Sequence, residues 1–381
     1  MIAPDVVVAG GGVIGLSIAW QSAVRGLSVL LADPHPGRGA SWAAAGMLAP
    51  VTEVHYGEER LLQLNLDSHA RYPKWAEALN EASGRDCGYA QTGTLVVARD
   101  ADDNAALNDL YDFQRSLGLD VERLRGRECR RFEPSLAPST RGGILVRGDH
   151  QIDNRALLEA LQSACERAGV QVTRHRVERV DVASGRVDGV VLDDGERVPC
   201  GALVLAAGAH SASIAGLPQE IVPPVRPVKG QLLHLRGHRD QRLSTHTIRG
   251  LEAYIVVRPD GRVVLGATVE EQGFDYRPTA GGVHELLRAG FELIPGITEL
   301  ELVETSVGLR PASPDNAPLL GETALDGLVL ATGHYRNGVL LAPVTGWAIA
   351  HLLATGATPE IITSFTPRRF SDPRIATGTG S

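Results

Sequence analysis

The 381-residue chain has few of the residues that mark several common protein classes. It contains only two lysines, Lys74 and Lys229, and its acidic residues outnumber the basic ones to give a formal net charge of -8. We therefore expect no nucleic-acid partner, because binding to phosphate needs a basic surface. The four cysteines lie far apart in the sequence. Their spacing excludes a C-x-x-C zinc site or disulfide framework and favours reduced thiols in a cytoplasmic protein.

The sequence also lacks an apolar run long enough for a membrane helix. The nearest candidate, residues 339–353, contains Pro343 and His351 and is more typical of a buried helix. Asp5 occupies the region where a secretory signal would carry basic residues, so we expect no membrane association and a cytoplasmic location. His234 and His238 have the spacing of helical metal ligands, but their segment is typical of a strand ended by glycine. We expect no metal site.

Aromatic residues make up only 4% of the chain, whereas glycine is abundant, a composition that suits α/β packing with tight turns. An apolar run at residues 6–9 precedes the motif Gly-Gly-Gly-Val-Ile-Gly at residues 10–15. Gly10 permits a tight turn, Gly12 lets a diphosphate approach the backbone, and Gly15 lets the following helix touch the strand. Asp33 ends the next apolar strand. Its spacing from Gly12 is that of an acidic residue that accepts hydrogen bonds from an adenosine ribose. The pattern predicts a dinucleotide site but does not distinguish FAD from NAD.

Two later junctions favour the longer cofactor. An apolar strand at 202–206 and another at 328–331 each lead into a glycine-containing turn, and we expect an apolar helix to start at Val339. NAD needs only one such junction, whereas the flavin of FAD must be held at a second place, where a helix start could stabilise negative charge on the ring. The small residues at 39–47 allow two interpretations: close approach of backbone to a ring or phosphate, or a tightly packed alanine-rich helix.

Together these motifs resemble the D-amino-acid-oxidase-like FAD-dependent oxidoreductases over about residues 3–370. The sequences Gly-Leu-Arg-Pro at 308–311 and Gly-His-Tyr-Arg-Asn-Gly at 333–338 are most similar to the glycine-oxidase branch, which serves thiazole formation in thiamine biosynthesis. The resemblance implies a flavoenzyme with non-covalent FAD. Such an enzyme oxidises glycine and other small amines or D-amino acids to an oxo acid (glyoxylate from glycine), ammonia and hydrogen peroxide. Hydride passes to flavin N5, and oxygen is the acceptor. A homo-oligomer, a tetramer in the family, is also implied.

The resemblance further implies roles for individual residues. Arg310 binds the substrate carboxylate, Arg336 lies at the same pocket, and Tyr254 adds a hydroxyl near that carboxylate. No catalytic acid or base is expected, because the flavin carries the redox chemistry and the protein supplies positioning. The expected cofactor contacts are Gly10, Gly12, Val13, Ile14, Gly15, Asp33, Pro34, Ala40, Ser41, Ala45, Gly46, Met47, Val177, His334, Tyr335, Arg336, Asn337, Gly338, Val339 and Leu340.

The sequence departs from the family pattern at three points. Asp33 stands where glutamate is usual, and Ala40 stands where a hydroxyl residue is common, so one hydrogen bond to the cofactor is missing there. No cysteine lies near Arg310 or Arg336, which argues against a covalent flavin.

We expect an α/β and α+β chain with interleaved domains. A Rossmann-like FAD domain with a parallel sheet takes residues 1–90, 143–222 and 323–370. A substrate domain built on a large antiparallel sheet takes 91–142 and 223–322, and 371–381 form a flexible tail. Two other functions stay open: a D-amino acid dehydrogenase with a non-oxygen acceptor, and a non-catalytic dinucleotide-binding module.

Overall fold

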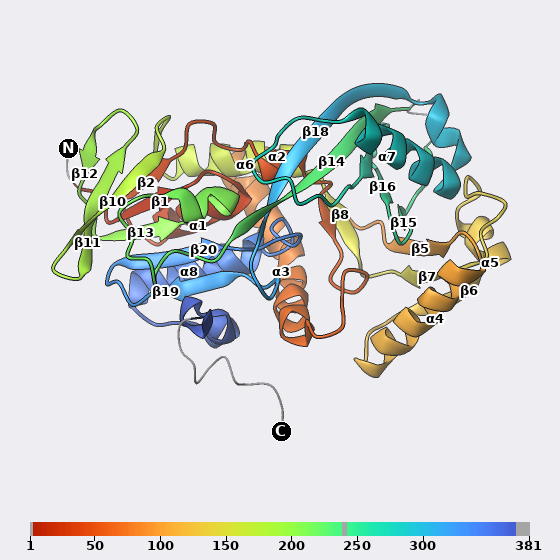
Figure 1. Ribbon diagram of the computed structural model, residues 1–381, viewed down its shortest axis with the longest axis horizontal. Helices are drawn as coiled ribbons and strands as arrows, with labels where there is room; N and C mark the ends of the chain where they lie inside the picture. The colour runs from red at the N-terminus through yellow and green to blue at the C-terminus, as the bar shows by residue number, and fades with distance from the viewer. Residues whose placement is uncertain (1–2, 238–241, 371–381) are drawn as a thin grey trace.

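The computed structural model describes residues 3–237 and 242–370 (Figure 1). The expected tail at 371–381 and His238 of the histidine pair lie outside these residues. Two large sheets organise the chain, and Figure 1 shows them at opposite ends of the long axis, with the long strands β14 and β18 crossing the middle. In the part of the chain that the structure describes, no helix combines the length and the apolar character needed to cross a membrane.

The first sheet has six strands and is parallel except at one edge, where β19 runs antiparallel to β20. All four residues of β1 are buried, as expected for a central strand covered on both faces. In order across the sheet, the strands are β19 (Leu319–Glu322), β20 (Leu328–Thr332), β13 (Ala202–Leu205), β1 (Val6–Ala9), β2 (Val29–Ala32) and β9 (Gln171–Thr173).

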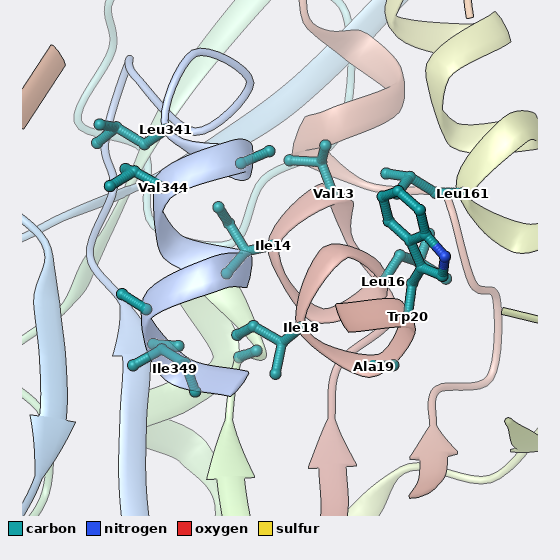
Figure 2. Close-up of a cluster of buried hydrophobic side chains, with 14 of the residues drawn as sticks. Val13, Ile14, Leu16, Ile18, Ala19, Trp20, Leu161, Leu341, Val344 and Ile349 are labelled. Carbon is teal, nitrogen blue, oxygen red and sulfur yellow. The ribbon is translucent and has the colours of Figure 1, made fainter. Parts of the chain in front are cut away.

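Helices cover one face of this sheet and a small antiparallel sheet packs on the other. Helix α1 lies against α8, and Figure 2 shows Ile14 and Ile18 of α1 directed toward α8. Each such buried aliphatic side chain stabilises the fold by about 1.5–3 kcal/mol. The helices are α1 (Val13–Val24), α3 (Glu59–Ser83), α6 (Asn154–Arg167) and α8 (Ala342–Thr355), and the small sheet contains β10 (Val177–Ala183), β11 (Arg186–Leu192) and β12 (Arg197–Val198).

The second large sheet has eight strands and is antiparallel apart from the β5–β15 pair. The expected fold class, a parallel cofactor sheet with a large antiparallel sheet, is confirmed. In order the strands are β18 (Glu301–Ala312), β14 (Arg226–Arg236), β17 (Arg262–Gly266), β16 (Tyr254–Val257), β15 (Thr247–Arg249), β5 (Thr94–Ala98), β7 (Gly142–Val146) and β6 (Glu122–Arg125).

One further sheet and several helices complete the fold. This second three-stranded sheet comprises β3 (Met47–Leu48), β8 (His150–Ile152) and β4 (Tyr89–Ala90). The remaining helices are α2 (Ala40–Ala43), α4 (Ala101–Ser116), α5 (Gly126–Phe132) and α7 (Ala280–Leu293), with 3₁₀ turns η1 (Gly208–Ser213), η2 (Pro295–Glu299), η3 (Glu360–Phe365) and η4 (Pro367–Phe370).

The division into two interleaved domains is our proposal, and the sheets suggest one change to its boundaries. Strand β7 pairs with β5 and β6 in the eight-stranded sheet, whereas the expected boundary assigns residues from 143 onward to the cofactor domain. We propose that the substrate domain extends to about residue 146.

All four cysteines are free, and Cys87, Cys129 and Cys165 are buried. Burial raises the pKa of Cys87 and of Cys129 to about 11 and that of Cys165 to about 12, so these thiols stay protonated at neutral pH.

Candidate active site

A cavity of about 1000 Å³ lies where the two large sheets meet. Its walls include the segments that follow the carboxyl ends of β1, β2, β13 and β20, together with residues of β14, β16 and β18. Ligands of parallel α/β sheets bind outside the carboxyl ends of the strands. The cavity is therefore placed to hold a nucleotide at one end and a small molecule against the second sheet at the other.

The first glycine turn lies at one end of the cavity and has the tight backbone geometry that the sequence predicts. Gly10 has a φ of +107°, and a Cβ there would overlap the backbone of Ala206, which directly follows β13. A Cβ at Gly15 would overlap the carbonyl oxygen of Gly10, so only glycine allows α1 to pack this closely against the turn. Gly15 does not line the cavity. The side chain of Ser41 accepts a hydrogen bond from Val13 N at 3.0 Å in the first turn of α1.

Asp33 is held in a fixed orientation at the end of β2. Its Oδ2 accepts a hydrogen bond from Gly11 N at 2.6 Å, and its Oδ1 accepts one from His35 N at 2.7 Å. The residue also lines the cavity. Carboxylate oxygens have several lone pairs, so Asp33 keeps acceptor capacity for ribose hydroxyls while the turn holds it.

Of the two interpretations of residues 39–47, the structure shows a short helix, and close approach to a ring or phosphate stays a prediction. Ala40–Ala43 form the short helix α2, and the chain then becomes extended into β3. Gly46 has a φ of +75°, and a Cβ there would overlap the carbonyl oxygen of Ile152. Buried Arg258 donates 2.6 Å hydrogen bonds to Ala45 O and to Gln151 Oε1. The eight-stranded sheet thus fixes the segment that lines the cavity.

The second glycine turn, residues 333–338, follows β20 and is attached to β18. Tyr335 N donates to the carbonyl oxygen of Pro311 at 2.9 Å, which places the turn beside Arg310. The prediction that the helix starts at Val339 is wrong, because α8 begins at Ala342. Residues 334–341 form turns instead, and Pro343, which has no N–H group, lies in the first helical turn where none is needed.

Two side chains of this turn, those of His334 and Asn337, are buried, and they differ in whether their polar atoms have hydrogen-bond partners. His334 contacts Thr345 Oγ1 through Nε2 at 3.1 Å, and burial lowers its pKa to about 3. The imidazole is therefore neutral at physiological pH. Asn337 is also buried and lines the cavity, but its Nδ2 has no hydrogen-bond partner within the protein. An orphaned donor facing the cavity fits a cofactor with carbonyl or ring-nitrogen acceptors.

Arg310 extends across the neighbouring strand at the other end of the cavity. Its Nη1 donates to Thr268 O at 3.0 Å and to Lys229 O at 3.4 Å. A Cβ at Gly230 would overlap the guanidinium, so this glycine makes room for it. In the part of the chain that the structure describes, no carboxylate pairs with Arg310.

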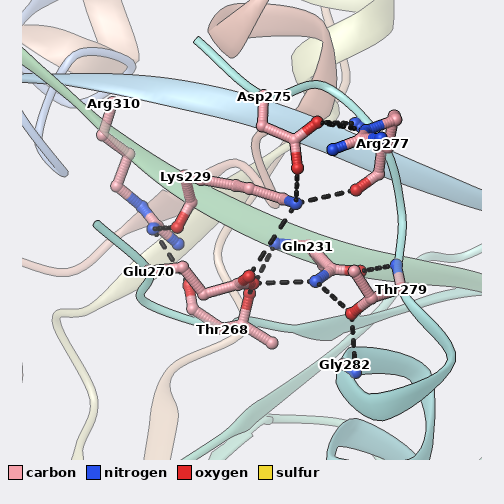
Figure 3. A network of polar contacts seen from close by, with 9 residues as sticks. All are labelled: Lys229, Gln231, Thr268, Glu270, Asp275, Arg277, Thr279, Gly282 and Arg310. Atoms are coloured by element: carbon pink, nitrogen blue, oxygen red, sulfur yellow. Dashed lines mark hydrogen bonds and ion pairs between the residues drawn. The ribbon is translucent and has the colours of Figure 1, made fainter. Parts of the chain in front are cut away.

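A buried polar network supports the loop that holds Arg310 (Figure 3). The side chain of Lys229 is 1% exposed, and its Nζ lies 2.9 Å from Asp275 Oδ2 and 2.7 Å from Arg277 O. Glu270 accepts hydrogen bonds from Thr268 Oγ1 and from Gln231 Nε2. These contacts fix the path of residues 268–279 and with it the carbonyl oxygen that orients Arg310.

Tyr254 faces the same end of the cavity from β16. It pairs with Arg249 across β15 and with Gly266 across β17, where a Cβ would overlap the phenol. Burial raises the pKa of Tyr254, although the nearby guanidiniums of Arg310 and Arg249 oppose that rise. The hydroxyl therefore stays protonated and available as a hydrogen-bond donor.

Arg336 also lines the cavity but is already ion-paired. Its Nε lies 3.3 Å from Glu53 Oε2, and its Nη2 pairs with Glu58. Glu53 pairs in turn with Arg249 of β15.

The structure brings together almost all of the residues that the sequence singled out. Apart from Gly15, every predicted cofactor and substrate residue lines this one cavity. Sequence reasoning missed Glu53, Arg249 and Arg258, because isolated charged residues in a strand or loop carry no motif. Only the β15–β16 pairing and the path of residues 49–53 place the first two of these side chains here.

No cysteine lines the cavity, and all four lie among the described residues. Nothing in it would tether a flavin covalently through sulfur. The glycine turn, Asp33 and Asn337 together offer donors and acceptors for a dinucleotide, and the donor set fits FAD.

Comparisons with known proteins agree with this geometry. The chain is 35% identical over 368 residues to a glycine oxidase of Geobacillus kaustophilus, covering 96% of this chain and 97% of the relative. It is 34% identical to a bifunctional ThiO/ThiG protein of Synechocystis, covering 96% of this chain and 54% of the relative, so it spans about half the length of that protein. The crystal structure of glycine oxidase from Geobacillus kaustophilus matches with a TM-score of 0.89 at 35% identity, over 96% of this chain and 98% of that one.

The family model described as FAD dependent oxidoreductase matches residues 5–352. Since this match covers most of the chain, the protein belongs to the DAO family of FAD-dependent oxidoreductases.

Proposed function

We propose that the protein oxidatively deaminates glycine and other small amino acids, and that it forms an oxo acid, ammonia and hydrogen peroxide. FAD, when bound, supplies the redox chemistry by accepting a hydride from the substrate α-carbon and passing electrons to oxygen. The relatives at 34–35% identity, a glycine oxidase and a ThiO/ThiG protein, support this substrate class and a role in thiamine biosynthesis.

The observation that carries the proposal is the unpaired guanidinium of Arg310 in the cavity that also holds the glycine turns. The guanidinium is half-buried, and a partly desolvated cation without a carboxylate partner is destabilised unless a ligand supplies one. The planar fork of arginine matches both oxygens of a carboxylate. The α-carboxylate of an amino acid therefore supplies the missing charge.

The neighbouring groups orient the substrate. The hydroxyl of Tyr254 donates a hydrogen bond to a carboxylate oxygen, and Arg336, paired with Glu53 and Glu58, forms part of the pocket wall. Ala43, Leu232 and Ala267 supply apolar surface that limits water around the α-carbon. No side chain is assigned as acid or base, since positioning accounts for what the protein contributes.

The cofactor contacts follow from the same cavity. We propose that Asp33 accepts hydrogen bonds from the ribose and that the start of α1 holds the diphosphate. Residues 45–47 and 334–340 then contact the flavin, and Asn337 donates its free N–H to it. Binding is non-covalent.

An anaerobic titration tests the proposal. The purified yellow protein is mixed with glycine, sarcosine, D-alanine and L-alanine in turn, and the flavin absorbance is followed. Glycine should bleach the flavin, and admitting air should restore the colour with one peroxide per turnover. Bleaching without peroxide would indicate a dehydrogenase with another acceptor, and a spectrum unchanged by every amino acid would contradict the proposal.

A further inference from the structure

Four charged side chains alternate in sign in a row, and three of them, Arg249, Glu53 and Arg336, line one wall of the cavity. Arg249 pairs with Glu53, Glu53 Oε2 lies 3.3 Å from Arg336 Nε, and Arg336 pairs with Glu58. Asn316 donates a 3.0 Å hydrogen bond to Glu58 from the side away from Arg336. Their side chains are at most 20% exposed. The two positive and two negative charges cancel, so this wall is electrically neutral as a unit.

Arg310 is different, since its guanidinium contacts two backbone carbonyl oxygens and, among the described residues, no carboxylate. The substrate end of the cavity therefore carries one positive charge, that of Arg310, which a single anionic group of the substrate can neutralise. Glu252 also lines the cavity, but it pairs outward with Arg99 and Arg288.

The neutral wall lies next to the proposed carboxylate site. Arg249 and Tyr254 are direct partners in the β15–β16 register, and Glu53 and Arg249 both line the cavity. Burial and the second guanidinium of Arg336 lower the pKa of Arg249 to about 10, so it remains charged at neutral pH. Two like charges held this close require an anion between them, and Glu53 supplies it.

The position of Glu53 is fixed by the chain around it. Buried Asp149 accepts hydrogen bonds from Val51 N at 3.1 Å and from Thr52 N at 2.7 Å, and the hydroxyl of Thr52 donates to it at 2.7 Å. Because the two residues before Glu53 are anchored, the backbone that carries its carboxylate is held beside the two guanidiniums.

We propose that Glu53 is a specificity-determining residue, and that by neutralising Arg249 and Arg336 it restricts the pocket to substrates with a single carboxylate. The inference rests on the proposed function and deepens it by naming the substrate class. A second carboxylate on the substrate would enter a wall with no free cation and would lose its hydration without compensation. Removing the charge of Glu53 while keeping its shape would leave one free cation beside Arg310.

The substitution Glu53→Gln tests this inference. In the parent protein, we expect glycine to be oxidised with a kcat/KM at least about 100-fold above that of iminodiacetate, which is glycine with a second carboxymethyl group. In E53Q, this ratio should fall about ten-fold or more. Malonate and acetate, titrated as non-reacting ligands through the flavin spectrum, give an independent measurement: malonate binding should tighten about ten-fold relative to acetate.

Two further variants act as controls. Glu252→Gln removes a carboxylate that also lines the cavity but pairs outward, so its selectivity should match that of the parent. The double variant E53Q/R249Q restores the charge balance and should regain the parent's preference for monocarboxylates. Unchanged selectivity in E53Q with full flavin content would overturn the inference, and so would equal effects of E53Q and E252Q.

If E53Q does not retain flavin, the inference is tested with the variant Arg249→Gln instead. It leaves one excess negative charge on the wall, so acetate binding should weaken about ten-fold, and unchanged acetate binding would overturn the inference. The proposed function fails separately. If the parent oxidises no small amino acid, that function is wrong, whereas glycine turnover with unaltered selectivity in the variants contradicts only the role of Glu53.

Discussion

Replacement of Arg310 by alanine addresses the central contact of the proposed site. The guanidinium offers a carboxylate two charge-assisted hydrogen bonds, each worth about 1.5–3 kcal/mol. The variant also leaves the substrate charge without a partner inside a cavity. We therefore expect a loss of about 3–5 kcal/mol, or roughly a 10²–10⁴-fold fall in kcat/KM for glycine, because each 1.4 kcal/mol is ten-fold.

The measurement combines steady-state peroxide formation with anaerobic flavin reduction. Arg310 lies at the substrate end of the cavity, so the flavin spectrum and its content should stay those of the parent. Arg310→Lys keeps the charge but loses the planar fork, and it should show an intermediate loss.

A primary amine without a carboxylate provides a second comparison. Since it cannot use the guanidinium, we expect R310A and the parent to oxidise it equally slowly. If R310A retains its flavin and its kcat/KM for glycine changes less than three-fold, the carboxylate clamp is wrong.

Three further outcomes follow from contacts described above. Gly15→Ala places a methyl group on the carbonyl oxygen of Gly10, so this variant should purify without FAD, and a yellow protein with parental absorbance would contradict the role of the turn. His334 is neutral in the fold because burial lowers its pKa to about 3 from an ordinary 6.5. The unfolded chain takes up the proton first as the pH falls, so stability present above pH 6.5 should be lost progressively toward pH 3, by an amount on the order of 5 kcal/mol. Urea unfolding at pH 7 and pH 4.5 should show a smaller difference in His334→Gln than in the parent. Lys229→Met leaves Asp275 and Glu270 without their buried cation and should cost about 2–4 kcal/mol, seen as a lower Tm and a higher KM for glycine, whereas an unchanged Tm would show that the network contributes little.

The cofactor end of the fold could be predicted from the sequence because local rules determine it. Gly10 and Gly15 are required by backbone geometry alone, and the apolar strand at 6–9 reveals a position buried on both faces. The same local signals place Asp33 at the end of β2. Such features depend on residues within about 25 positions in the sequence, so they can be recognised from a single sequence.

The substrate end could be predicted only in part. Arg310 and Tyr254 were found through family resemblance, not through their spacing. The space each one occupies depends on Gly230 and Gly266 in neighbouring strands, and sequence order does not reveal that register. Glu53 and Arg249 meet only after residues 49–53 and β15 are folded against the same cavity. The start of α8 was misplaced for a related reason: apolar spacing continues through residues 339–341, but the turn anchored on β18 delays the helix to Ala342.

The cavity is lined by parts of the chain that lie far apart in the sequence. Gly10 and Asp33 leave the ribosome long before residues 333–340 do. A nucleotide captured by the early segment alone would lack every contact of the late turn, including the free amide of Asn337. Tight retention of the cofactor therefore requires both segments to be folded, and a ligand that binds only the fold containing both stabilises it by mass action. A bound flavin would thus connect two segments that are distant in the sequence.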